Sequence, residues 1–244
     1  MKNSGRASPA RSPRQKGLRC TSLGSTSKNS LCRRVETHRL LLVGKTGAGK
    51  SVWLNLVTRQ FPRVLIWDPH PERENFTGLR ITGAATLKNH LVRLQNKPRW
   101  RLRYIPTDET CGDNFLLLAD RLCDAVLVVD EVVGFAPKAK IHPVFARCIS
   151  FGRNRGLSIL SATQRMARVN NDMVDNSDVY VVFPGQVARA LKDLQSAAPE
   201  RFQDMLHNPE YHPVVCGDPR IIAEHYRDLD GANIQDVEWL KKKP

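Results

Sequence analysis

Residues 39–52 read RLLLVGKTGAGKSV, and this stretch decides the fold. An apolar run over 40–43 is followed by Gly44, four further residues and the tripeptide GKS at 49–51. Together they complete the pattern G-x-x-x-x-G-K-[ST]. The apolar run is typical of a strand, and the apolar residues over 52–57 are typical of a helix. The pattern therefore stands between a strand and a helix, which is the context it requires.

The chemistry of phosphate binding explains this spacing. Glycines let the backbone fold around a phosphate with its N–H groups pointing inward, and the following helix adds its positive N-terminal end. In such loops the lysine reaches the β- and γ-phosphates and the hydroxyl residue ligates Mg²⁺. A chance glycine-rich turn is the alternative. We predict that the chain binds a nucleoside triphosphate and Mg²⁺ through Gly44, Lys45, Thr46, Gly47, Ala48, Gly49, Lys50 and Ser51, with Ser51 as a metal ligand.

The net charge of +14 over 244 residues is compatible with an anionic partner such as nucleic acid. The charge is uneven, however, because residues 1–39 hold ten Lys and Arg against one acid. The remaining residues carry 28 basic and 23 acidic side chains, so the folded part is only mildly basic.

The six cysteines are scattered, without a C-x-x-C pair, and no run of 18 apolar residues occurs. We therefore expect no zinc site, no transmembrane helix and an intracellular protein with reduced thiols.

Residues 1–37 are rich in Ser, Arg, Lys, Gly and Pro, and we expect a disordered basic tail. Three interpretations stay open: an arm that contacts nucleic acid, a passive tail, or an over-extended start with the real protein beginning near Val35. Residues 38–244 form the second predicted unit, a P-loop ATPase domain. In this unit strand-like and helix-like segments alternate, which predicts an α/β fold with a mainly parallel sheet and helices on both faces.

An acidic pair, Asp130-Glu131, ends the apolar run AVLVV at 125–129. At the carboxyl end of a buried parallel strand such a pair lies where ligands bind. In a P-loop enzyme Asp130 would hold Mg²⁺ through water, and Glu131 would orient and deprotonate the attacking water. The alternative is that both residues are merely the polar end of a strand.

The segment FGRNRGLSILSATQR at 151–165 contains three further candidates. Gln164 follows an apolar strand and is predicted to contact the γ-phosphate and the lytic water; a surface amide is the alternative. Arg153 and Arg155 are candidate arginine fingers, which would stabilise transition-state charge across a subunit boundary. A solvated helix end, favoured by the helix dipole, would explain the same arginines.

The four segments LLLVGKTGAGKS, VLIWDPH, VLVVDE and GRNRGLSILSATQR resemble the HerA/FtsK superfamily of additional-strand, RecA-like P-loop ATPases. Within it they are most similar to the genome-packaging ATPases of membrane-containing double-jelly-roll viruses of the tectivirus and corticovirus kind. The resemblance covers roughly residues 38–185. Members often have His at the position of Asn154 and Pro at that of Met166, so the subfamily assignment is the weaker part.

The resemblance implies a ring, often a hexamer, that couples ATP hydrolysis to translocation of double-stranded DNA. It also implies an extra strand between the P-loop strand and the acidic strand, Gln164 as the sensor and Arg153 as the finger. A packaging role would bring capsid vertex or portal proteins as partners, and a location in the host cytoplasm or at a packaging vertex.

Translocases grip DNA phosphates through loops rich in Lys and Arg. The segments 134–140 and 165–168 have the position and charge for such loops, although ordinary solvated loops are the alternative. Asp68 and His70 end the second strand on the ligand side, where Asp68 either assists the site or simply ends the strand.

We predict an ATP-hydrolysing motor that translocates double-stranded DNA and packages a viral genome. Three alternatives stay open: a cellular or plasmid HerA/FtsK-type translocase, a filamentous-phage-type assembly or export ATPase, and a nucleotide-dependent switch or kinase.

Overall fold

The computed structural model describes residues 37–108, 111–183, 186–200, 202–203 and 214–216. These residues fall within one compact unit, Arg34–Pro244. The predicted basic tail, 1–37, lies outside the described residues except for its last position.

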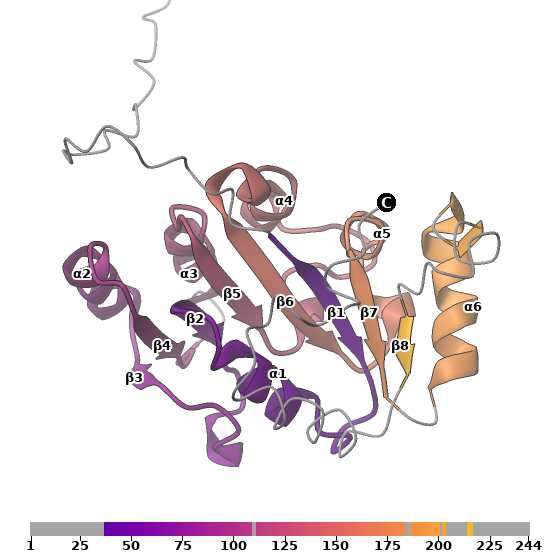
Figure 1. Ribbon diagram of the computed structural model, residues 1–244, viewed down its shortest axis with the longest axis horizontal. Helices are drawn as coiled ribbons and strands as arrows, with labels where there is room; N and C mark the ends of the chain where they lie inside the picture. The colour runs from indigo at the N-terminus through magenta and orange to yellow at the C-terminus, as the bar shows by residue number, and fades with distance from the viewer. Residues whose placement is uncertain (1–36, 109–110, 184–185, 201, 204–213, 217–244) are drawn as a thin grey trace, which may run out of the picture. The chain divides into compact units, whose positions relative to one another are not determined.

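The described residues form an eight-stranded sheet in the order β3-β4-β2-β5-β6-β1-β7-β8, and all of its strand pairings are parallel (Figure 1). The strands are β1 (Arg39–Val43), β2 (Arg63–Trp67), β3 (Leu79–Ile81), β4 (Trp100–Tyr104), β5 (Ala125–Val129), β6 (Leu157–Thr163), β7 (Val179–Val182) and β8 (Val214–Cys216). The helices are α1 (Lys50–Thr58), α2 (Ala84–Leu94), α3 (Cys111–Ala119), α4 (Pro143–Phe151), α5 (Asn171–Asp175) and α6 (Val187–Ala197).

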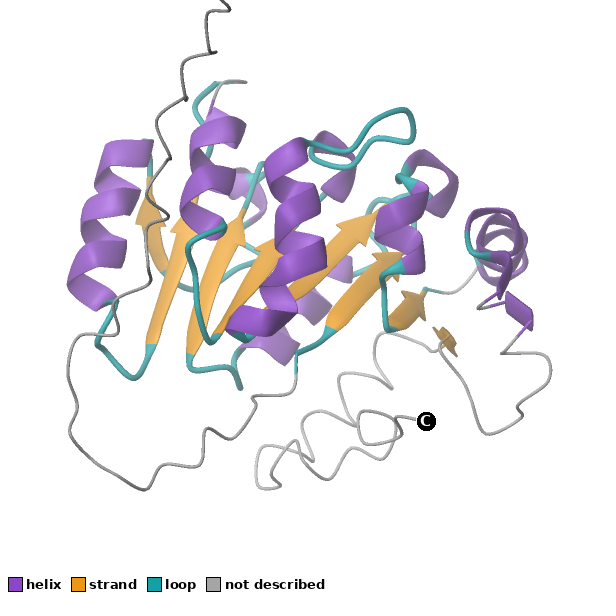
Figure 2. Cartoon of the chain, turned by 90° about the horizontal axis from the view of Figure 1, so that it is seen from above, coloured by secondary structure: helices purple, strands orange, loops and turns teal. Residues whose placement is uncertain are grey.

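Helices cover both faces of the sheet, as predicted (Figure 2). On one face, α1 packs over a core that includes Trp53 and Leu54. On the other, a larger core takes side chains from the remaining helices, among them Phe115 of α3 and Phe145 of α4. The central strands are therefore buried on both sides, which explains why they read as continuous apolar runs.

Alternation along β1 shows how one strand serves both cores. Leu40 and Leu42 belong to the core under α1, whereas Leu41 and Val43 belong to the larger core. All four side chains are at most 3% exposed. At about 25 cal/mol per Å² of buried apolar surface, such strands supply much of the stability of the sheet.

The strand order brings three strand ends together. β6 lies between β1 and β5, so an extra strand separates the P-loop strand from the acidic strand. The P-loop follows β1, the acidic pair follows β5 and Gln164 follows β6. Because all three strands are parallel, these segments lie together at the carboxyl ends of the strands, called here the carboxyl edge of the sheet.

Two short elements were not predicted from the sequence. β3 has three residues, too few for an alternating pattern, and pairs at the sheet edge with β4. The single turn α5 begins after Asn170, whose side chain accepts a hydrogen bond from the backbone N–H of Asp172. That cap is a recognisable helix start, but five residues carry no helical periodicity.

Candidate functional site: a phosphate-binding loop facing an acidic pair

The P-loop takes the backbone conformations for which its glycines are needed. Gly47 and Gly49 have φ values of 79° and 93°, in the left-handed region that favours glycine. A Cβ on Gly44 would lie 2.9 Å from the Cβ of Phe183, so this glycine is required for packing. Thr46, in the exposed part of the loop, also lines the cavity described below.

Lys50 is the first residue of α1, and its side chain folds back over the loop. Its Nζ donates hydrogen bonds to the carbonyl oxygens of Gly44 at 2.7 Å and Lys45 at 3.0 Å. Burial lowers the pKa of Lys50, while the charges of Asp130 and Glu131 oppose that shift. The ammonium group of Lys50 is thus hydrogen-bonded to neutral carbonyls, in the wall of a cavity that is suited to an anion.

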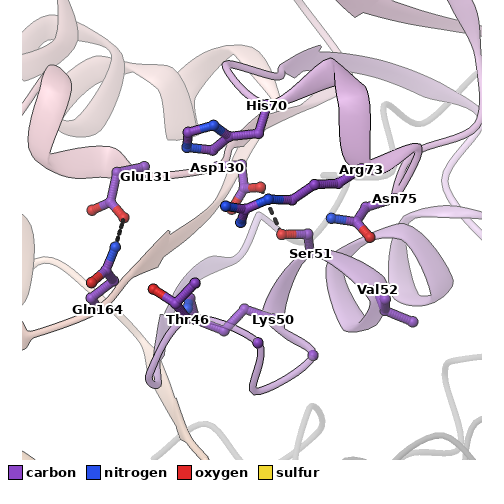
Figure 3. Close-up of a pocket in the computed structure, with 12 residues that line it drawn as sticks. Thr46, Lys50, Ser51, Val52, His70, Arg73, Asn75, Asp130, Glu131 and Gln164 are labelled. Carbon is purple, nitrogen blue, oxygen red and sulfur yellow. Dashed lines mark hydrogen bonds between the residues drawn. The ribbon is translucent and has the colours of Figure 1, made fainter.

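Ser51 joins the P-loop to the acidic strand. Its Oγ donates a 2.7 Å hydrogen bond to Oδ2 of Asp130, across 79 residues of sequence (Figure 3). Burial raises the pKa of Asp130, and the hydrogen bond from Ser51 partly counteracts this. Carboxylate and hydroxyl oxygens are the ligands Mg²⁺ prefers, and a buried carboxylate gains from a nearby cation. The residues therefore fit the predicted metal.

Glu131 and Gln164 lie side by side in the cavity wall, within hydrogen-bonding distance of each other (Figure 3). Nε2 of Gln164 donates to Oε2 of Glu131 at 3.4 Å, a long hydrogen bond. Burial raises the pKa of Glu131; the charge of Lys50 and the Gln164 hydrogen bond lower it.

The backbone of Glu131 is strained. Its φ of 66° lies in the left-handed region, which costs a non-glycine residue roughly 1 kcal/mol or more. The chain turns here from β5 into a 3-10 helix, Val132–Gly134. The turn directs the carboxylate into the cavity instead of along the strand (Figure 3).

These groups line one cavity of about 660 Å³. The predicted residues in its wall come from the P-loop, the acidic pair and the end of β6. His70 was expected only on the ligand side of the sheet. Four residues of the cavity wall were not predicted as site residues: Val52, His70, Arg73 and Asn75. The last three lie on the loop after β2, which the sequence marks only as a proline-rich turn.

Asp68 does not line this cavity. Its side chain is 2% exposed, forms a buried ion pair with Arg103 and accepts a hydrogen bond from the backbone N–H of His70 at 3.1 Å. It therefore holds the loop after β2, while His70 is in the cavity wall.

Arg153 and Arg155 lie away from the cavity, in a 3-10 turn that precedes β6. Arg153 donates to Asp178, which precedes β7, at 2.7 Å, and Arg155 donates to Asp120 at 3.0 Å. Both arginines thus lie at the amino ends of the strands, called here the amino edge of the sheet, opposite the P-loop. From there they could reach a nucleotide only in another subunit, and their role as arginine fingers stays a prediction.

The two candidate DNA-contacting segments, 134–140 and 165–168, are joined. The backbone N–H of Lys138 donates to the carbonyl oxygen of Arg168 at 2.8 Å, and an antiparallel bridge pairs Pro137 with Val169. The side chains of Lys138, Lys140 and Arg168 are exposed. Two segments marked separately in the sequence thus form one basic surface.

A P-loop between β1 and α1, an acidic pair after β5 and the intervening β6 define the fold of the P-loop NTPases. Comparison with solved structures places the same fold in the genome-packaging NTPase B204 of Sulfolobus turreted icosahedral virus 2. Its sulfate complex matches with a TM-score of 0.52 and 17% identity over 69% of this chain and 84% of B204. Its AMPPCP complex matches with a TM-score of 0.51 and 18% identity, over 69% and 86% of the two chains.

No protein-family model matches the sequence, and no curated protein matches it. None of the helices in the described part of the chain has the length and apolar character needed to span a membrane.

Proposed function

We propose that this protein binds and hydrolyses ATP. One observation carries the proposal: a phosphate-binding loop with a buried lysine faces a carboxylate–amide pair across a single cavity. The loop supplies affinity for phosphates, and Glu131 with Gln164 supplies the groups that hydrolysis needs.

Glu131 acts as the general base in this proposal. Its carboxylate accepts a proton from a water molecule as the water oxygen bonds to the γ-phosphorus and the bond to the β–γ bridging oxygen breaks. ADP leaves with the electron pair of that bond. Gln164 orients the water and Lys50 neutralises charge on the phosphates.

Ser51 and Asp130 would hold Mg²⁺. The ion, when bound, neutralises phosphate charge and orients the phosphates. The chain's own contribution is to fix both oxygen ligands before nucleotide arrives, through the hydrogen bond between them.

Glu131→Gln tests the hydrolysis proposal in the full chain. Removal of the base should lower steady-state ATP turnover by at least about 10²-fold while leaving ATP bound. Glu200→Gln, at an exposed glutamate outside the cavity wall, is the matched control and should keep full turnover. Equal turnover of the wild type and Glu131→Gln would contradict the proposed role of Glu131. An inactive wild type would favour a nucleotide-dependent switch.

We further propose that hydrolysis drives translocation of double-stranded DNA during packaging of a viral genome. The sequence motifs of the HerA/FtsK superfamily and the fold shared with a viral genome-packaging NTPase support this. The joined basic segments 134–140 and 165–168 supply a surface for sequence-independent phosphate contacts. Capsid vertex or portal proteins would then be partners, at a packaging vertex or in the host cytoplasm.

DNA-stimulated turnover at low salt tests the choice of cargo. Double-stranded DNA should raise turnover of the wild type, and a triple alanine variant at Lys138, Lys140 and Arg168 should lose that stimulation while keeping basal turnover. A matched triple variant on and just after α2, at Lys88, Arg93 and Lys97, should respond like the wild type. Hydrolysis indifferent to DNA would point to protein cargo, as in an export ATPase.

A ring, in the simplest case a hexamer, would let Arg153 or Arg155 serve the neighbouring subunit. Mixing tests this sharply. Glu131→Gln and Arg153→Ala should each be inactive alone, but mixed rings should regain turnover because a Glu131→Gln subunit still supplies an intact Arg153 to its neighbour. Arg155→Ala in the same experiment identifies which arginine acts. Unchanged turnover of both arginine variants would exclude the finger role.

A further inference from the structure

The loop after β2 supplies side chains to the cavity that the P-loop pattern does not account for. His70, Arg73 and Asn75 line the wall opposite Lys50 (Figure 3). Arg73 carries the permanent charge among them and lines the same cavity as Ser51 and Asp130 (Figure 3). Its side chain is 48% exposed, so it is open to a ligand that enters the cavity.

One buried guanidinium holds both ends of this loop. Arg103 of β4 forms a buried ion pair with Asp68, where β2 ends. It also donates to the carbonyl oxygens of Pro71 at 3.0 Å and Phe76 at 3.3 Å. The five N–H donors of an arginine can make several such contacts at once, and the contacts of Arg103 fix the loop on either side of Arg73.

The far end of the loop is tied to the P-loop helix. Phe76 is 4% exposed in the core under α1. The backbone N–H of Thr77 donates to Oδ1 of Asn55, on α1, at 3.0 Å, and Arg101 donates to the same oxygen at 2.9 Å. The backbone that carries Arg73 is therefore fixed relative to Lys50 and Ser51.

The charges around Arg73 favour an anionic ligand. Among the described residues, Arg73 forms an ion pair with Glu72, which lies 3.8 Å from its Nε and is itself 65% exposed, and such exposed pairs are weak. Lys50 and Arg73 both line this cavity, together with the carboxylates of Asp130 and Glu131. Two cations that converge on one cavity repel each other until an anion lies between them.

We infer that Arg73 is a second phosphate-binding cation, supplied by the same chain, which contacts the β- or γ-phosphate of a bound nucleoside triphosphate. This inference rests on the proposed ATP-binding function. It assigns to the loop after β2 the task of closing the phosphate site from the side opposite the P-loop, with the Asp68–Arg103 pair as its support.

Calorimetric titration of the full chain with ATP and with AMP, both with Mg²⁺, tests the inference. Arg73→Ala should raise the Kd for ATP about tenfold, the scale of hydrogen bonds to charged groups, and leave that for AMP unchanged. Arg73→Lys should recover part of the loss. Arg80→Ala, an exposed arginine on β3 outside the cavity wall, is the matched control and should bind like the wild type.

Lys50→Met separates failure of this inference from failure of the proposed function. If Lys50→Met loses ATP and Arg73→Ala binds within twofold of the wild type, Arg73 is not a phosphate ligand and ATP binding stands. An equal loss of ATP and AMP affinity in Arg73→Ala would also overturn the inference, because the effect would not lie at the distal phosphates. A wild type that binds no ATP would overturn both proposals.

Discussion

The two edges of the sheet both carry clustered charges, but they differ in the number of hydrogen bonds and ion pairs that hold each charged group. At the amino edge Arg39 donates to three main-chain carbonyls, and Arg153 and Arg155 each pair with an aspartate. At the carboxyl edge Lys50 is held by carbonyls alone, and Glu131 has one long hydrogen bond and a strained backbone.

The difference indicates a division of labour. Charged groups held by ion pairs or by several hydrogen bonds stabilise the fold, whereas groups with fewer partners are held ready for a ligand at the cost of some stability. Substitution of Arg39 at the amino edge should therefore act on the free energy of unfolding, and substitutions at the carboxyl edge should act on nucleotide binding and turnover.

The largest effect is expected at Arg39. Its side chain is 0% exposed, and it donates to the carbonyl oxygens of Leu157, Cys148 and Ile149 at 2.7, 3.3 and 3.1 Å. Arg39→Met would remove three buried hydrogen bonds to main-chain carbonyls, so urea unfolding should show a loss of about 3 kcal/mol. Arg93→Met, on the exposed face of α2, is the control and should change stability by less than about 0.5 kcal/mol. Equal stability of the two variants would remove the contrast between the edges.

Lys50→Met should have the opposite effects: a large change in the affinity for ATP and a small change in stability. We expect the Kd for ATP to rise roughly 10²-fold, because a charge-assisted contact with phosphate is lost. The free energy of unfolding should change by less than about 1 kcal/mol, because Lys50 lines the cavity, where water can hydrogen-bond to the two carbonyls that it leaves.

Lys88→Met is the matched control, since Lys88 is an exposed lysine on α2 outside the cavity wall. Parallel titrations and unfolding curves report both quantities. A strongly destabilised Lys50→Met would show that this lysine also holds the fold.

The roles of the charged residues could not all be predicted equally well from the sequence. The P-loop, the acidic pair and Gln164 follow from short motifs and from the rule that parallel strands end together, and the structure brings them to one cavity. Arg73 carries no motif. It reaches the cavity because Arg103, 30 positions later in the sequence, holds the loop from a neighbouring strand.

The amino edge shows the same limit for Arg39. In the sequence it reads as the last residue before an apolar strand, indistinguishable from an exposed basic residue. Its burial depends on carbonyls at 148, 149 and 157, which the fold alone brings together. Tertiary hydrogen bonds of this kind have no local pattern to detect.

The pH dependence of turnover should report the incomplete compensation of Glu131. Burial raises the pKa of Glu131 above the ordinary glutamate value of 4.5, and a general base must be ionised to act. Turnover should therefore fall on acidification with a midpoint above 4.5. Gln164→Ala should move this midpoint further up, because the hydrogen bond that stabilises the carboxylate is lost. A midpoint at or below the ordinary value would contradict the assignment of Glu131 as base.

The smallest effect is expected for the exposed pair at the amino edge. Arg153 and Asp178 form a 2.7 Å ion pair with side chains 37% and 28% exposed. A double-mutant cycle of Arg153→Ala and Asp178→Asn, followed by urea unfolding, should give a coupling of about 0.5 kcal/mol. Asp178→Asn alone should cost more than Arg153→Ala, because Asp178 also accepts the backbone N–H of Arg39 at 2.9 Å. A coupling near 3 kcal/mol would place Arg153 with Arg39 among the structural residues. A small coupling leaves Arg153 free, at little energetic cost, to exchange Asp178 for a phosphate on a neighbouring subunit.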